Sequence, residues 1–102
     1  MHTFIEWEGR PDERLKGTFF TLYEAIFATP VNKEIQERVE NCADLHLILA
    51  FDADQNAAGF KIGYREDPDT FYSWLGGVLP AYRNQGLAAA MMERQHQWCR
   101  QK

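Results

Sequence analysis

The run from Gly77 to Ala88 constrains the fold of this chain more than any other stretch of its sequence. An apolar segment typical of a strand ends at Pro80, and an alanine-rich segment typical of a helix follows Gly86, so a strand passes into a helix through a short turn. Gly86 has no Cβ, which allows a ligand to approach its backbone closely. The start of such a helix directs free amides and the positive end of the helix dipole at one point, which suits a pyrophosphate. The run therefore predicts a site for an anionic cofactor.

The composition indicates one compact domain over residues 1–102. The chain is 45% apolar and 14% aromatic, which is enough for a hydrophobic core. Its net charge of −4 disfavours nucleic-acid binding, because phosphate recognition usually requires a basic face, and no G-x-G-x-x-G pattern follows a strand. The segment from Arg83 to Lys102 contains four basic residues and one acidic residue, Glu93, so its net charge is +3 and that of the rest of the chain is −7. This distribution would suit an anionic cofactor at the C-terminal end and a cationic substrate elsewhere.

The two cysteines, Cys42 and Cys99, have neither the spacing of metal ligands nor that of a disulfide framework. We expect both to be free thiols that are at least half-buried, and we expect no metal site. The N-terminal residues include Glu6 where a signal peptide would be apolar, and no stretch is long enough to span a membrane. A cytoplasmic location without a membrane partner is therefore expected.

Hydrophobic periodicity predicts an α+β fold in which helices flank an antiparallel β-sheet. The order is strand, helix, helix, strand, strand, strand, helix, and the three consecutive strands form a meander of two hairpins. The expected elements are a strand over 3–7, a helix from near Pro11 to before Pro30, a helix over 33–41 capped by Asn32, strands over 45–51, 60–65 and 70–79, and a helix after Gly86.

Apolar residues at helical spacing predict which helix faces pack on the sheet. In the first helix they are Leu15, Phe19, Leu22, Tyr23, Ile26 and Phe27. In the last helix they are Leu87, Met91 and Trp98, with Ala88, Met92 and Cys99 beside them. The strand over 45–51 is apolar throughout and should be covered on both faces, so its His46 is expected to be a hydrogen-bonded core residue rather than a catalyst.

The pattern Val78-x-Pro80-x-Tyr82-Arg83-x-x-Gly86-x-Ala88 resembles the acyl-CoA-binding signature of the GNAT superfamily of N-acetyltransferases. That signature is Gln or Arg, x, x, Gly, x, Gly or Ala, placed between a strand and a helix, and the order of elements is similar as well. The resemblance implies the N-terminal part of an acyl-CoA N-acyltransferase fold, acetyl-CoA as cosubstrate, and acetyl transfer to a primary amine.

The resemblance also implies which residues hold acetyl-CoA. Backbone groups of Gly77, Val78 and Leu79 would bind the pantetheine arm, and Arg83 would add charge or brace the turn. The pyrophosphate would lie among Asn84, Gln85, Gly86, Leu87 and Ala88.

No catalytic base or acid follows from the sequence. In the family, the elements that carry Glu24, Glu66, Tyr72 and Ser73 border the acceptor side, but each of these residues is expected to be solvated or to serve in packing. His96 is expected to face solvent and Trp74 to lie in the core, whereas a backbone amide over 77–79 could polarise the thioester carbonyl.

The family continues after this helix with another strand, another helix and a final hairpin, and the sequence stops at Lys102. In the family that strand is the second wall of the pantetheine cleft, and that helix often carries the tyrosine that protonates the thiolate. Three interpretations follow: an inactive fragment, a short form in which a second copy covers the open edge over 76–79, or a CoA-binding or interaction module without catalysis. The acceptor stays undetermined.

Overall fold

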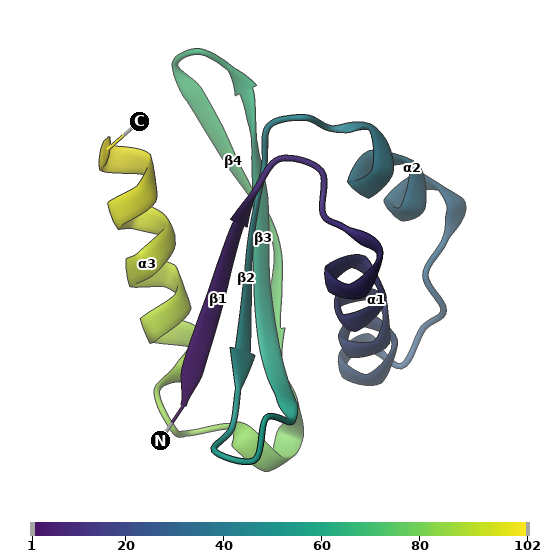
Figure 1. Cartoon of the computed structure of the whole chain (residues 1–102), viewed down its shortest axis with the longest axis vertical. Coiled ribbons are helices and arrows are strands. Elements are labelled where there is room, and N and C mark those ends of the chain that lie inside the picture. The colour runs from purple at the N-terminus through teal and green to yellow at the C-terminus, as the bar shows by residue number, and fades with distance from the viewer. Residues whose placement is uncertain (1, 102) are drawn as a thin grey trace.

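The computed structural model describes residues 2–101 and confirms the predicted α+β order (Figure 1). Each predicted element forms, and a short 3-10 helix, η1, precedes the last helix. The elements are β1 (Thr3–Glu8), α1 (Glu13–Phe27), α2 (Lys33–Asn41), β2 (Leu45–Phe51), β3 (Ala57–Asp67), β4 (Thr70–Val78), η1 (Pro80–Tyr82) and α3 (Leu87–Gln101).

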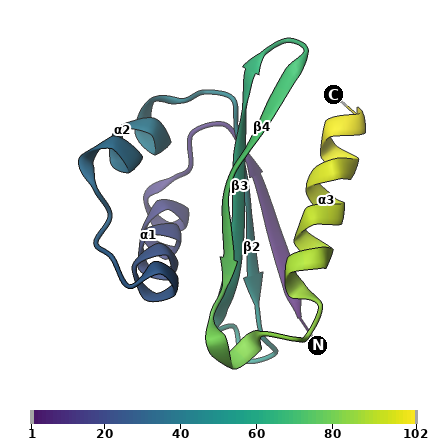
Figure 2. The ribbon, with the colours of Figure 1, turned by 180° about the vertical axis from the view of Figure 1, so that it is seen from behind.

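The four strands form one antiparallel sheet in the order β1-β2-β3-β4. Helices α1 and α2 cover one face of this sheet and α3 covers the other, as both views show (Figures 1 and 2). Strands β1 and β4 are the edges of the sheet within the described chain. The outer edge of β4, which leads into α3, is therefore open.

Side-chain capping explains why the first two helices begin where they do. Asp12 Oδ1 accepts a hydrogen bond from the amide of Leu15, and Asn32 Oδ1 accepts one from the amide of Ile35, both at 2.8 Å. Each bond satisfies an amide that has no partner within the helix. Helix α1 ends at Ala28, whose φ of 52° lies in the left-handed region, two residues before the helix-breaking Pro30.

The hydrophobic core lies on both faces of the sheet. Under α1 and α2, Phe19 and Phe60 are fully buried and meet edge to face with ring centroids 4.9 Å apart. Under α3 a smaller cluster contains Ile48, Val78 and Leu87. Strand β2 supplies alternate residues to both clusters, which confirms that it is covered on both faces.

The buried stripe of α3 differs from the predicted one. Leu87, Met91 and Gln95 are buried, whereas Met92 is 47% exposed and Trp98 is half-buried. Hydrophobic spacing could not select Gln95, because this polar residue is buried through a specific partner. Its side chain meets Nδ1 of the buried His46 on β2 at 3.2 Å.

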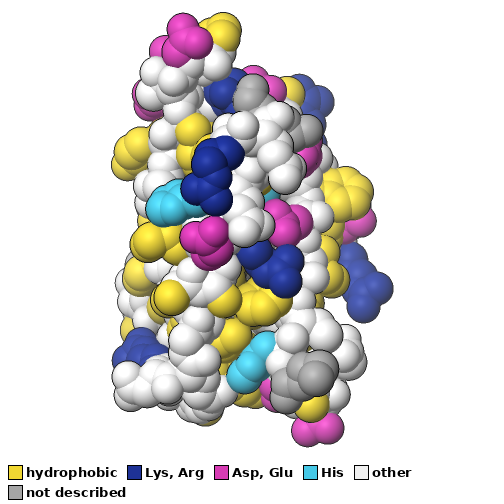
Figure 3. Space-filling model, turned by 90° about the vertical axis from the view of Figure 1, so that its left-hand side faces the viewer, with side chains coloured by type: hydrophobic (Ala, Val, Ile, Leu, Met, Phe, Trp, Pro, Cys, Tyr) yellow, Lys and Arg dark blue, Asp and Glu magenta, His cyan; other side chains and the backbone are white. Residues whose placement is uncertain are grey.

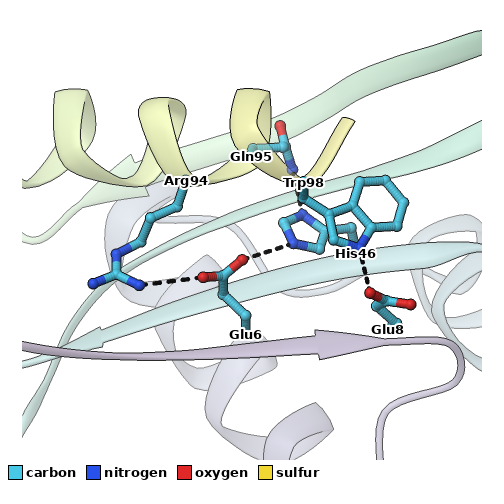
Figure 4. A network of polar contacts seen from close by, with 6 residues as sticks. All are labelled: Glu6, Glu8, His46, Arg94, Gln95 and Trp98. Carbon is cyan, nitrogen blue, oxygen red and sulfur yellow. Dashed lines mark hydrogen bonds and ion pairs between the residues drawn. The ribbon is translucent and has the colours of Figure 1, made fainter. Parts of the chain in front are cut away.

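The polar network around His46 joins α3 to the first two strands (Figure 4). His46 Nε2 lies 3.2 Å from Glu6, which also pairs with Arg94 at 3.2 Å. Trp98 stacks on the imidazole at 4.4 Å and donates a hydrogen bond to Glu8. Burial lowers the pKa of His46, and the neighbouring Glu6 opposes that shift. The interpretation of His46 as a satisfied core histidine is confirmed.

Candidate functional site

A cleft of about 740 Å³ runs along the open edge of β4. Its walls come from the end of α1, the adjoining parts of β3 and β4, the turn after β4 and the first two turns of α3. The half-buried Trp74 packs against the core and also lines the cleft. Figure 3 views the molecule from the side of α3 and shows apolar side chains reaching the surface beside this helix. Residues of α1 and of α3, which cover opposite faces of the sheet, line the cleft together, so it extends from one face to the other.

The open edge of β4 presents polar backbone groups to this cleft. The amide of Leu79 donates to the carbonyl of Ala58 at 2.9 Å, so these two residues form a hydrogen-bonded pair. Along an antiparallel strand, residues that are hydrogen-bonded to the neighbouring strand alternate with residues that are not. The N–H and C=O of Gly77 therefore point toward β3, whereas those of Gly76 and Val78 point outward. An extended ligand beside β4 would therefore meet Gly76 and Val78.

This geometry changes the assignment of backbone groups along β4. Of the three residues expected to offer backbone groups to pantetheine, Val78 directs them outward, whereas Gly77 uses its own within the sheet. Leu79 donates its amide to the carbonyl of Ala58, and its own carbonyl accepts from the amide of Tyr82 at 2.9 Å. Gly77 has a separate structural role, because a Cβ there would lie 2.8 Å from Cγ2 of Ile26 on α1. The close packing of α1 on β4 therefore requires a glycine at this position.

The turn between β4 and α3 leaves its amides free. Asn84 and Gly86 have φ angles of 65° and 78°, and a Cβ on Gly86 would have no neighbour within 4 Å. The first helical hydrogen bond runs from the amide of Ala90 to the carbonyl of Gly86 at 3.0 Å. The amides just before it, at 87–89, therefore have no helical acceptor and can bind an anion.

Seven of the nine residues predicted to bind the cofactor line this one cleft. They are Gly77, Val78, Arg83, Asn84, Gly86, Leu87 and Ala88. The two that do not line it are Leu79, which packs against the core under α1 and α2, and Gln85, whose Nε2 donates to the carbonyl of Ala81 at 3.4 Å. Arg83 braces the turn through Nε, which donates to the carbonyl of Val78 at 3.3 Å. The role of these residues in binding stays a prediction.

The charged side chains that line the cleft are Lys61 and Arg83, with no carboxylate among the lining residues. Lys61 Nζ donates to Ser73 Oγ at 2.8 Å, and burial lowers the pKa of Lys61. Two other cations of the C-terminal segment are paired elsewhere, Arg94 with Glu6 and Arg100 with Glu93. The cleft therefore concentrates positive charge and favours an anionic ligand.

A hydrogen bond between Tyr82 and Asp52 anchors the turn to the rest of the sheet. The hydroxyl of Tyr82 donates to Asp52 Oδ2 at 2.6 Å, and the amides of Asp54 and Asn56 donate to Oδ1. The Tyr82 bond is the main cause that lowers the pKa of Asp52 from 3.8 to about 2, and it raises the pKa of Tyr82. Sequence reasoning missed Asp52 and Lys61, because the partners of both depend on strand register.

Of the four side chains considered for catalysis, only Ser73 lies in the cleft. Glu24 instead accepts a hydrogen bond from the amide of Val31 at 3.0 Å. Glu66 lies beside the β3–β4 hairpin, and Tyr72 is 45% exposed. His96 is exposed, as expected. The residues that line the cleft thus include no carboxylate or imidazole to act as a general base.

Cys42 and Cys99 are half-buried free thiols, as expected. Burial raises the pKa of Cys99, so its thiol is not activated as a nucleophile. Within residues 2–101, no three His, Cys, Asp or Glu side chains come together in a way that could hold a metal ion. None of the helices described is both long and apolar enough to cross a membrane.

Comparison with known proteins shows the family and the fold of the chain. Residues 5–102 match the family model described as the Acetyltransferase (GNAT) family. This match covers the cleft, the turn and all four strands except the first two residues of β1. A search of curated protein sequences found no relative.

Solved structures of low sequence identity share this fold. An acetyltransferase of the GNAT family from Staphylococcus aureus has a TM-score of 0.79 at 18% identity, over 99% of this chain and 68% of that one. The aminoglycoside antibiotic 6'-N-acetyltransferase AAC(6')-Ih from Acinetobacter baumannii has a TM-score of 0.71 at 17% identity, over 96% and 71%. AAC(6')-Iy, in complex with the bisubstrate analog CoA-S-monomethyl-acetylneamine, has a TM-score of 0.72 at 16% identity, over 99% of this chain and 73% of that one.

Proposed function

This chain belongs to the GNAT acetyltransferase family, and we propose that it transfers an acetyl group from acetyl-CoA to a primary amine. The observation that carries the proposal is the cleft beside β4. It combines two cations, no lining carboxylate, free amides at the start of α3 and an open strand edge. A long anionic ligand with an extended amide-containing arm matches each of these features.

The residues of the cleft would divide the work of holding acetyl-CoA. The amides of Leu87 and Ala88, together with the guanidinium of Arg83, would bind the pyrophosphate. The outward backbone groups of Gly76 and the amide of Val78 would pair with the pantetheine arm, while the carbonyl of Val78 accepts from Arg83 Nε. Bound in this way, acetyl-CoA supplies an activated acyl group, and a neutral amine acceptor would approach from the side of α1.

Isothermal titration calorimetry with acetyl-CoA, followed by an acetylation assay on a panel of amines, tests the proposal. We expect binding, and release of free CoA thiol with at least one amine. Two of the similar structures are aminoglycoside acetyltransferases, so the panel includes aminoglycosides beside polyamines and peptides. Absence of both binding and thiol release would refute the proposal.

A matched pair of variants tests the location of the site. Ala88→Asp places a carboxylate at the start of α3, beside the amides, and should abolish acetyl-CoA binding by charge repulsion. Ala25→Asp introduces the same charge on an exposed position of α1 outside the cleft and should leave binding unchanged. Equal binding by both variants would place the site elsewhere.

A CoA-binding or interaction module without turnover is the second candidate function. The lack of a carboxylate or imidazole among the residues that line the cleft favours it, since acetyl transfer requires a deprotonated amine. An inactive fragment would likewise show no turnover. Tight binding of acetyl-CoA without thiol release for any amine would support the module over the enzyme.

We propose further that a second copy of the chain packs across the open edge over 76–79 and supplies the opposing wall of the cleft. An unpaired edge strand tends to recruit another chain, and β4 carries no covering element within the described residues. Sedimentation velocity at micromolar concentration, with and without acetyl-CoA, tests this. A monomer under both conditions would refute the dimer.

A further inference from the structure

Lys61 is one of the two cations that line the cleft, but no contact with acetyl-CoA has been assigned to it. It pairs with Gly76 across β3 and β4, and a Cβ on Gly76 would lie 3.7 Å from Cγ of Lys61. The aliphatic part of the lysine therefore rests against the strand that lines the cleft. Its Nζ reaches along β4 to Ser73 Oγ at 2.8 Å, and both residues line the cleft.

Lys61 differs from the other described lysines in the surroundings of its ammonium group, because no carboxylate faces it. Lys16 lies 3.0 Å from Glu13 and 3.2 Å from Glu40, and the exposed Lys33 lies 3.8 Å from Glu37. For Lys61, burial alone lowers the pKa, so a larger share of neutral amine is present than at an exposed lysine. A neutral amine is the nucleophilic form of this side chain.

The path along β4 leads from the turn to this amine. Val78 and Ser73 are five residues apart, which is roughly 16 Å in an extended strand. An extended pantetheine arm that begins at the turn and follows the outward groups of Val78 and Gly76 can span such a distance. The thioester end of the arm would then lie near Nζ of Lys61.

We propose that Lys61 is itself a site of acetylation, modified on Nζ by the acetyl-CoA held in its own cleft. This inference rests on the proposed function, because it requires acetyl-CoA in the cleft. The neutral amine attacks the thioester carbonyl, a C–N bond forms, the C–S bond breaks, and CoA leaves as a thiolate that takes up the proton lost by nitrogen. The product is a neutral amide, and the cleft loses one of its two positive charges.

Mass spectrometry of peptides from protein incubated with acetyl-CoA tests the proposal. Lys33, which is exposed and on α2, is the internal control for acetylation by chemical reaction in solution. We expect Lys61 to be acetylated at least about tenfold faster than Lys33, because the thioester is held beside it. Excess CoA should suppress acetylation of Lys61 and leave that of Lys33 unchanged.

Lys61→Arg keeps the positive charge and should remove the modification while the circular dichroism spectrum stays the same. Equal rates at Lys61 and Lys33, or acetyl found on Ser73 instead, would overturn the proposal. Calorimetry separates this failure from failure of the proposed function, since acetyl-CoA would still bind. If acetyl-CoA does not bind, both proposals fail. The acetylating reagent p-nitrophenyl acetate needs no CoA site, so its rates at the two lysines then show whether Lys61 is more nucleophilic than Lys33.

Discussion

At the level of single residues, the turn that leads into α3 is held by one hydrogen bond from a distant hairpin. Tyr82 donates to Asp52 at 2.6 Å, and these residues are 30 positions apart. The bond favours the ionised carboxylate, which explains why the pKa of Asp52 falls to about 2. This bond therefore links the turn before the free amides at 87–89 to a carboxylate outside the cleft.

Tyr82→Phe should make the stability of the protein less dependent on acid pH. Asp52 ionises at a lower pH in the folded chain than in the unfolded chain, so its contribution to stability is present above about pH 4 and is lost as the pH falls toward 2. The variant lacks the hydrogen bond that is the main cause of the pKa shift, so we expect its stability to fall less than that of the wild type between pH 4 and pH 2. Thermal unfolding from pH 6 to pH 2 measures this, with Tyr72→Phe, at an exposed ring, as the control. Parallel curves for wild type and Tyr82→Phe would contradict the prediction.

Gly86→Ala isolates the effect of backbone conformation. A Cβ there meets nothing within 4 Å, so any loss comes from the φ of 78°, at a cost of about 1–2 kcal/mol. Gly17 on α1 is equally unhindered but has a helical backbone, so Gly17→Ala should stabilise by roughly 0.5–1 kcal/mol. Urea unfolding measures the stability of both variants. If both substitutions changed stability in the same direction, the backbone conformation at Gly86 would not be strained by a side chain.

At the level of elements, two adjacent residues of β4 meet two different structural requirements. One side of the strand must admit α1, and the proposed binding of acetyl-CoA requires that its outer edge remain free. Gly77 serves the first requirement and Gly76 lies on the second. Two successive glycines in a strand are costly to order, and a close neighbour, Ile26, explains the glycine at position 77.

Gly77→Ala should destabilise the protein by about 1–3 kcal/mol, because its Cβ would lie 2.8 Å from Cγ2 of Ile26 and would force α1 away from the sheet. Gly76→Ala should change stability little, since its nearest contact would be an ordinary 3.5 Å. Adding Ile26→Ala to Gly77→Ala removes the clash and should recover part of the loss. Equal destabilisation at both glycines in urea unfolding would contradict this account.

At the level of the whole molecule, charge is separated between the cleft and the remaining surface. The chain has a net charge of −4, yet the charged residues that line the cleft are both cations. Cations elsewhere on α3 are paired with glutamates, so they add little to the field at the cleft. An acidic protein can therefore still attract an anionic cofactor to one place on its surface.

Arg83→Gln should weaken acetyl-CoA binding about tenfold, or about 1.4 kcal/mol, and reduce its dependence on salt. Arg100→Gln removes the same charge from α3 outside the cleft, where Arg100 pairs with Glu93, and should have little effect. Calorimetry at low and high ionic strength measures both variants. Equal losses for the two would mean that the overall charge of the chain, rather than the cleft, attracts the ligand.

The local features of this protein could be predicted from its sequence. The order of elements, the Asn32 cap, the bounds of α2 and the turn before α3 all depend on residues close together in the chain. Hydrophobic spacing and capping act over a few residues, so they can be recognised without a fold. Most of the residues predicted to bind the cofactor belong to the same local motif, which explains why seven of the nine line one cleft.

Only the tertiary structure decided the contacts that join distant segments. Lys61 and Ser73 are 12 residues apart, Tyr82 and Asp52 are 30 apart, and His46 and Gln95 are 49 apart. Strand register decided that Gly76 and Val78, rather than Gly77, direct their backbone N–H and C=O groups into the cleft, since a shift of one residue reverses the direction of every backbone group. The sequence by itself thus determined the fold class and the turn that is predicted to bind an anion. The partners of its buried polar groups were decided by packing, because such groups select neighbours by geometry and not by spacing along the chain.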